Sequence, residues 1–98
     1  MTQEVTITHE GDAMRGEYTA HIAESGETGE LTWRAQGPGV RVATHTGVPQ
    51  SMQGRGIAAR LVEAMIADAR EEGFRILPAC SYVAAQFKRH PEWADLRA

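Results

Sequence analysis

The first half of the chain alternates apolar and polar side chains with a period of two, which is typical of strands that bury one face. Residues that favour turns separate four such segments: Val5 to His9, Arg15 to Ile22, Leu31 to Ala35 and Val40 to Thr46. In the last segment the alternation predicts that Thr44 and Thr46 share one face, and that Ala43 and His45 share the other. Because the connecting turns are short, we expect the four strands to form an antiparallel meander.

After Pro49 the spacing of the apolar residues changes. They recur every three or four positions from Ile57 to Ala69, which predicts an amphipathic helix, and Gly73 stands where a helix C-cap belongs. A fifth strand, a second helix capped by Ser81 and a last turn should follow, over Phe74 to Leu77, Ser81 to about Arg89, and Pro91 to Leu96.

A strand, a helix and a strand in this order imply a parallel strand pair with a right-handed crossover. The expected fold class is therefore α+β, with a mostly antiparallel five-stranded mixed sheet, one β-α-β unit and three-layer-like packing. The region after His45, the turn before Ile57 and Cys80 should converge near the carboxyl ends of the two parallel strands, where open sheets tend to bind ligands.

The composition narrows the class of protein. The chain has 98 residues, 42% of them hydrophobic and 23% charged, with a net charge of -3. These values favour a single globular domain over residues 1–98 rather than a disordered or nucleic-acid-binding protein. No apolar run approaches the ~20 residues that span a bilayer. The start, Met1 to Glu4, has no basic segment followed by an apolar one, so we expect a cytoplasmic protein without a membrane role.

A glycine-rich segment, Gln53 to Ala58, lies between the fourth strand and the long helix. Glycines let the backbone approach a ligand closely, and the turn directs free N–H groups outward at the positive end of the helix dipole. The segment lacks the ending of a P-loop and the third glycine of a dinucleotide fold. We therefore expect an anionic ligand other than a nucleoside triphosphate or a nicotinamide cofactor; a tight helix entrance without a ligand is the alternative.

The order of elements, together with Thr44 to Pro49, Gln53 to Ala58 and Pro78 to Val83, resembles the acetyl-CoA-dependent N-acetyltransferase superfamily, known as GNAT. The similarity is to a small stand-alone branch of about the length of this chain. It implies acetyl-CoA or coenzyme A as cosubstrate, with the pyrophosphate on the glycine turn and the pantetheine beside the fourth strand. The implied cofactor-binding residues are Thr46, Gly47, Val48, Gln53, Gly54, Arg55, Gly56, Ile57, Ala58 and Ser81. Ser51 replaces the usual Arg or Gln of the family's turn, and Arg60 is a further candidate for phosphate contact.

The resemblance also implies a proton donor for the departing thiolate, often a tyrosine in the helix after the fifth strand. The corresponding stretch, Ala84 to Lys88, has none, and Tyr82 comes earlier. Cys80 precedes a helix whose N-terminal field should lower the pKa of a thiol, so it could act as acid or as nucleophile. His45 is the candidate general base, or a partner of Cys80 across the cleft. The alternatives are a buried small side chain for Cys80 and a solvent-facing strand histidine for His45.

The function expected from the resemblance is acetyl transfer to an amine on a protein lysine, an N-terminus or a polyamine. A module that holds coenzyme A without turnover and a partner-binding domain with a purely structural turn are the alternatives. No His or Cys pair has the spacing of metal ligands, so we expect no metal site. We expect a monomer or a weak dimer, because the outer strand could pair.

Overall fold

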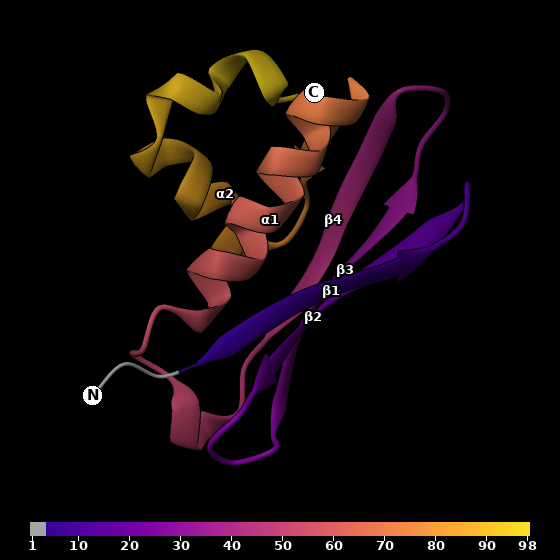
Figure 1. The fold of residues 1–98 in the computed structure, drawn as a ribbon. Helices are drawn as coiled ribbons and strands as arrows, with labels where there is room; N and C mark the ends of the chain where they lie inside the picture. Colours follow the sequence, from indigo (N-terminus) through magenta and orange to yellow (C-terminus); the bar gives the residue numbers. More distant parts are fainter. Residues whose placement is uncertain (1–3) are drawn as a thin grey trace.

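The computed structural model describes residues 4–98 and shows a five-stranded sheet with helices packed on it (Figure 1). Met1 to Gln3, part of the segment inspected for an export signal, lie outside the described residues. The strands follow each other in chain order across the sheet: β1 (Val5–Gly11), β2 (Arg15–Ile22), β3 (Thr28–Ala35), β4 (Val40–Gly47) and β5 (Arg75–Pro78). The pairs from β1 to β4 are antiparallel and β4 pairs with β5 in parallel, which confirms the predicted meander and mixed sheet.

Two helices and two short 3-10 turns complete the fold: α1 (Ile57–Glu72), α2 (Ser81–Arg89), η1 (Gln50–Met52) and η2 (Pro91–Leu96). Gly73 ends α1 in the left-handed conformation and donates its N–H to the carbonyl of Ala69 at 2.8 Å, as a C-cap glycine does. The N-cap of α2 is Cys80 and not Ser81, because the backbone is still extended at Cys80 and helical from Ser81. None of the described helices is long and apolar enough to cross a membrane.

The two helices cover the same face of the sheet (Figure 1). Inward residues of β2 and β3, such as Tyr18 and Leu31, belong to one buried cluster with Leu61 of α1 and Phe87 of α2. Apolar burial of this kind is the main stabilising contribution in a chain of this size. The opposite face of β2 and β3 remains open to solvent, so the α+β class is confirmed, while the packing has two layers and not the expected three-layer-like arrangement.

A bulge interrupts the alternation of β4. The pairing with β3 shifts so that Trp33 lies opposite Ala43 and Thr32 lies opposite His45, which leaves Thr44 as an extra residue. Thr44 and His45 are consequently both exposed, while Ala43 is buried. The expectation that Thr44 and Thr46 share a face is therefore wrong, because the extra residue reverses the alternation after Ala43.

β4 and β5 part within the sheet. Their pairing runs only from Val40 to Ala43 on β4, and Pro78, the last residue of β5, lies opposite Ala43. The N–H of Cys80 then donates to the carbonyl of Ala43 at 2.9 Å. β4 continues to Gly47 without a described strand on that side, so from Thr44 onward its edge is paired with no strand, although the backbone amide of Thr46 contacts the Cys80 thiol.

Candidate functional site

A cleft of about 560 Å³ lies beyond the point where the two parallel strands part, and neither a residue of β5 nor Cys80 lines it. The end of β4, the glycine turn with the start of α1, and one face of α2 line it. Seven of the predicted cofactor-binding residues line the cleft: Thr46, Val48, Gln53, Gly54, Gly56, Ile57 and Ala58. The other three, Gly47, Arg55 and Ser81, adjoin it in sequence without lining it.

The glycine turn presents free backbone N–H groups to this cleft. Gly54 and Gly56 have φ angles of 82° and 77°, a left-handed conformation that favours glycine. Gly56 is the N-cap of α1, no side chain caps it, and the first turn holds no acidic residue. The first four N–H groups of a helix have no acceptor within the helix, so an anion placed here would meet several donors and the positive end of the dipole.

The arginines near the turn differ in what they contact. Arg60 donates to the backbone carbonyl of Val5 at 3.1 Å, so its guanidinium joins α1 to β1 rather than facing the cleft. Arg55 is exposed beside the turn. Arg89 of α2, which the sequence did not single out, lines the cleft opposite the turn and supplies a positive charge there.

Ser51 stands where the family usually has an Arg or Gln. Its hydroxyl donates to Glu27 at 3.1 Å, which fixes η1 to the β2–β3 turn. The amide of Gln53 donates to the carbonyl of Val48 at 3.4 Å, across the loop that leads into the glycine turn. These contacts hold the loop from both sides, so the turn is positioned by side chains that do not themselves need to touch a ligand.

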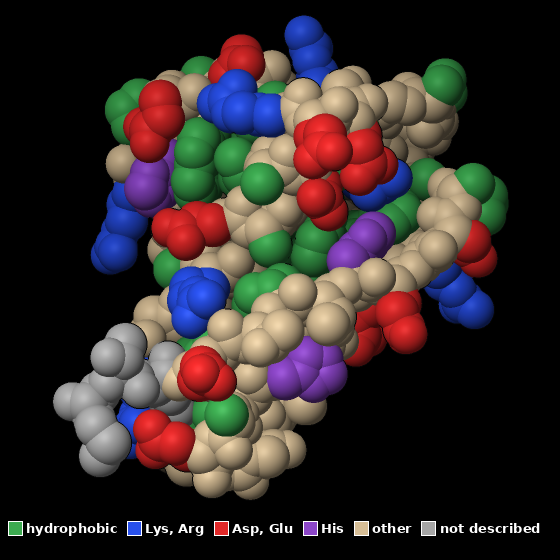
Figure 2. Space-filling model, viewed as in Figure 1, with side chains coloured by type: hydrophobic (Ala, Val, Ile, Leu, Met, Phe, Trp, Pro, Cys, Tyr) green, Lys and Arg blue, Asp and Glu red, His purple; other side chains and the backbone are tan. Residues whose placement is uncertain are grey.

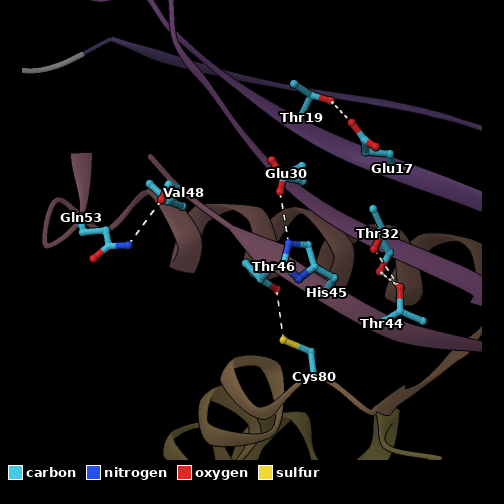
Figure 3. Close-up of polar contacts among 10 residues, drawn as sticks. All are labelled: Glu17, Thr19, Glu30, Thr32, Thr44, His45, Thr46, Val48, Gln53 and Cys80. Carbon is cyan, nitrogen blue, oxygen red and sulfur yellow. Dashed lines mark hydrogen bonds and ion pairs between the residues drawn. The ribbon is translucent and has the colours of Figure 1, made fainter. Parts of the chain in front are cut away.

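Cys80 is fixed at the point where the strands part. Its thiol lies 3.6 Å from the hydroxyl of Thr46 and can donate to it (Figure 3). Burial raises the pKa of the thiol, but the backbone amides of Val83, Tyr82 and Thr46 and the hydroxyl of Thr46 outweigh burial, and the net pKa is lowered. A lowered pKa means more thiolate at neutral pH, and the thiolate is the reactive form.

His45 does not contact Cys80. The ring nitrogen Nε2 of His45 lies 3.3 Å from a carboxylate oxygen of Glu30, and the His45 side chain is 63% exposed. Figure 3 shows the His45 ring turned toward Glu30 and the Thr46 hydroxyl turned toward Cys80. Because neighbouring strand residues point to opposite faces, the expected partnership of His45 with Cys80 in one cleft is wrong.

On the α2 side of the cleft, the sequence indicated Tyr82 as a tyrosine earlier than the usual proton donor and did not identify Gln86 or Arg89. Tyr82, Gln86 and Arg89 line the cleft, and the amide of Gln86 donates to the hydroxyl of Tyr82 at 3.1 Å. Burial is the main cause that raises the pKa of Tyr82. The three residues are spaced i, i+4 and i+7, which places them on one helix face, so the periodicity of α2 could have indicated them.

Two further features bear on the kind of ligand. Among residues 4–98, no three His, Cys, Asp or Glu side chains gather as metal ligands do. On the face drawn in Figure 2, acidic and basic side chains of the described residues are interspersed, without a broad basic area. The donors that this cleft offers are the backbone amides of the glycine turn, the guanidinium of Arg89 and the polar side chains that line it from β4, the loop and α2.

Comparisons with known proteins agree with this geometry. The family model described as GCN5-related N-acetyl-transferase matches residues 17–96. The chain is also similar to the solution structure of a GCN5-like candidate N-acetyltransferase from Staphylococcus aureus, with a TM-score of 0.70 and 22% identity. That similarity covers 97% of this chain and 87% of the other, and it shows that the two share a fold.

Proposed function

Since the chain belongs to the family of GCN5-related N-acetyltransferases, we propose that it transfers the acetyl group of acetyl-CoA to an amine, with Cys80 at the reaction centre. One observation carries the proposal. The free edge of β4, the uncapped start of α1 and a thiol of lowered pKa all border the place where β4 and β5 part.

The cosubstrate fits these donors. The diphosphate of coenzyme A needs N–H donors and positive charge, which the start of α1 and Arg89 offer on two sides of the cleft. The amides of the pantetheine arm need a backbone edge, and β4 offers one from Thr44 to Gly47. An arm laid along this edge would bring the thioester toward Cys80.

The lowered thiol pKa favours a nucleophilic Cys80 over an acidic one, because an acid must keep its proton until the leaving group departs. In the first half-reaction Sγ bonds to the acetyl carbon, the carbon–sulfur bond of the thioester breaks, and its electron pair leaves on the sulfur of coenzyme A. In the second, the neutral amine attacks acetyl-Cys80, gives up a proton to a base, and restores the thiolate. His45, on the open face of β4 and without contact to Cys80, is our candidate for that base, with solvent at the gap between β4 and β5 carrying the proton to it.

Mass spectrometry of the protein after incubation with acetyl-CoA tests the proposal. We expect one acetyl group on Cys80, and its loss when an amine acceptor is added. Cys80→Ala should carry no adduct and should lose acetyl transfer, whereas Gln36→Ala, at an exposed position in the turn between β3 and β4, should keep both.

Two other outcomes would contradict the proposal in different ways. Full transfer by Cys80→Ala would remove both the nucleophilic and the acidic role of the thiol. Binding of coenzyme A without loss of acetyl from acetyl-CoA, across a panel of amines, would instead indicate a binding module.

Acceptor and compartment follow from the same proposal. The open sheet face places no wall beside β4, which suits an amine on a protein lysine, an N-terminus or a polyamine. A free thiol as reaction centre suits a reducing compartment such as the cytoplasm.

We propose a monomer or weak dimer that binds no nucleic acid. Sedimentation with and without the cosubstrate would test the oligomeric state.

A further inference from the structure

Glu30, His45 and Gly47 form a small cluster on the open face of the sheet, behind the free edge of β4 (Figure 3). We propose that Glu30 is a positioning residue: it holds the His45 ring so that Nδ1 is free to take the proton of an acceptor amine arriving over this face. The inference rests on the proposed acetyl transfer and adds to it a residue and a direction of approach for the acceptor.

The sheet register brings the cluster together. Glu30 lies opposite Gly47, and Thr32, two residues further along β3, lies opposite His45. Glu30 alternates with the buried Gly29 and Leu31, so its side chain is on the open face. The bulge at Thr44 turns His45 to that same face, where Nε2 lies 3.3 Å from Glu30 Oε2.

Gly47 leaves the space that this pair occupies. A Cβ added at Gly47 would lie 2.5 Å from Glu30 Oε2 and 3.0 Å from His45 Nε2. The backbone of Gly47 does not need glycine, since its φ is outside the left-handed region. The absence of a side chain is therefore what lets the carboxylate and the imidazole meet.

Folding alone gives little reason for such a pair. The Glu30 and His45 side chains are 37% and 63% exposed, and exposed ion pairs contribute little to stability because water and salt screen them. A carboxylate beside one ring nitrogen does have a defined chemical effect: it favours the tautomer with the proton on that nitrogen. With Nε2–H directed at Glu30, the lone pair on Nδ1 is available to a proton donor.

The proton balance is complete with groups already named. As the nitrogen–carbon bond of the amide forms, the amine gives up one proton, which reaches Nδ1 of His45 on the open face through water at the gap between β4 and β5. The carbon–sulfur bond of the acetyl donor breaks and its electron pair leaves on sulfur. His45 then returns its proton to solvent.

Kinetics of three variants test the positioning role. Glu30→Ala should lower kcat by about tenfold, a fraction of the roughly 10²- to 10⁴-fold that a general base contributes, while KM for acetyl-CoA stays the same. Glu30→Gln should recover part of the loss, because its carbonyl can still accept from Nε2–H. Gly47→Ala should resemble Glu30→Ala, since the added methyl displaces the end of a flexible side chain rather than the backbone.

Two controls separate positioning from a general effect. Glu17→Ala removes a carboxylate from the same face, one that accepts from the hydroxyl of Thr19 at 3.3 Å, and should leave kcat unchanged. In a His45→Gln background, Glu30→Ala should cause no further loss, because Glu30 acts through His45.

A second readout does not depend on activity. Long-range ¹H–¹⁵N NMR spectra of the His45 ring should show the Nε2–H tautomer in the wild type and a mixture of tautomers in Glu30→Ala. Wild-type kcat or an unchanged tautomer in that variant would overturn this inference and leave the acetyl transfer standing. Absence of transfer by the wild type would instead overturn the proposed function, and the role of the pair with it.

Discussion

Three positions beside the site require glycine, and they do so for two different physical reasons. Gly54 and Gly56 adopt positive φ angles with nothing within 4 Å of an added Cβ, so their constraint is conformational. Gly47 has ordinary dihedral angles and is constrained by its neighbours Glu30 and His45. Substitution by alanine should therefore have different effects at the two kinds of position.

Gly56→Ala should lower the free energy of unfolding by about 1–2 kcal/mol, the cost of a left-handed non-glycine residue, and weaken coenzyme A binding. Gly37→Ala is the matched control, because Gly37 has a φ of 67° and also borders open space, but lies in a turn away from the cleft. It should lose the same stability and keep the affinity. Urea unfolding and calorimetric titration measure the two effects; equal affinity in both variants would contradict a binding role for the turn.

The thiol of Cys80 should react with iodoacetamide at a lower pH than a free cysteine does, because its pKa is lowered. Thr46→Val removes one of the groups that lower it, so the midpoint of the pH–rate curve should move to higher pH. Alkylation rates followed by mass spectrometry provide the measurement. A midpoint that does not move in Thr46→Val would show that backbone amides lower the pKa without help from the Thr46 hydroxyl.

At the scale of the elements, periodicity predicted most of the fold. It located α1 from Ile57 to the C-cap at Gly73 and the end of α2 at Arg89, but it placed the cap of α2 at Ser81, one residue after the observed Cys80. It shifted β5 by one residue and did not foresee η1. The helices were located more accurately than these elements, because α1 and α2 each bury one continuous apolar face.

The arrangement around β4 could not be predicted in the same way. A bulge adds one residue without any mark in the local alternation, so the faces of Thr44 and His45 depend on the register with β3. Glu30 and His45 meet through that register alone. The sequence was therefore enough to identify the cleft residues of the glycine turn, but not to place His45 and Thr46 on opposite faces of the sheet.

The hydroxyl of Tyr18 joins β2 to α1, since it donates to Asp68 at 2.7 Å. Tyr18→Phe should lower the free energy of unfolding by about 1–2 kcal/mol at neutral pH, because it leaves a partly buried acceptor unpaired. Burial and the bond to Asp68 raise the pKa of Tyr18 above its ordinary 10.0. The contribution of a group with a raised pKa is complete below the unfolded value and is lost as pH rises above it.

The stability difference between the wild type and Tyr18→Phe should accordingly shrink above about pH 10. Urea unfolding at neutral and at alkaline pH measures it. Asp68→Asn keeps an acceptor for the hydroxyl and should lose less stability than Tyr18→Phe. A difference that grows with pH would contradict this account.

At the scale of the whole molecule, the two-layer architecture divides the sheet into parts that respond differently to a ligand. The β1–β2 hairpin is far from the cleft in the strand order, whereas the end of β4 and the start of α1 border it. Backbone amides that gain a hydrogen-bond partner exchange more slowly, while distant ones are unaffected unless the whole fold is stabilised.

Hydrogen exchange with saturating coenzyme A should therefore slow at residues 44–47 of β4 and in the first turn of α1, and remain unchanged in β1. Mass spectrometry of peptic fragments can resolve these segments. Gly56→Ala provides the control, since it should reduce the effect at both places. Slower exchange only in β1 and β2 would place the ligand elsewhere.

The free edge of β4 also bears on how the protein behaves at high concentration. Unpaired backbone groups on an extended strand can accept a strand from another molecule, which is how edge strands start aggregation. Here the exposed stretch is short, and Pro49, which has no N–H to donate, follows it closely. A cosubstrate lying along this edge would occupy the same hydrogen-bonding groups, so storage with coenzyme A should keep the protein dispersed for longer than storage without it.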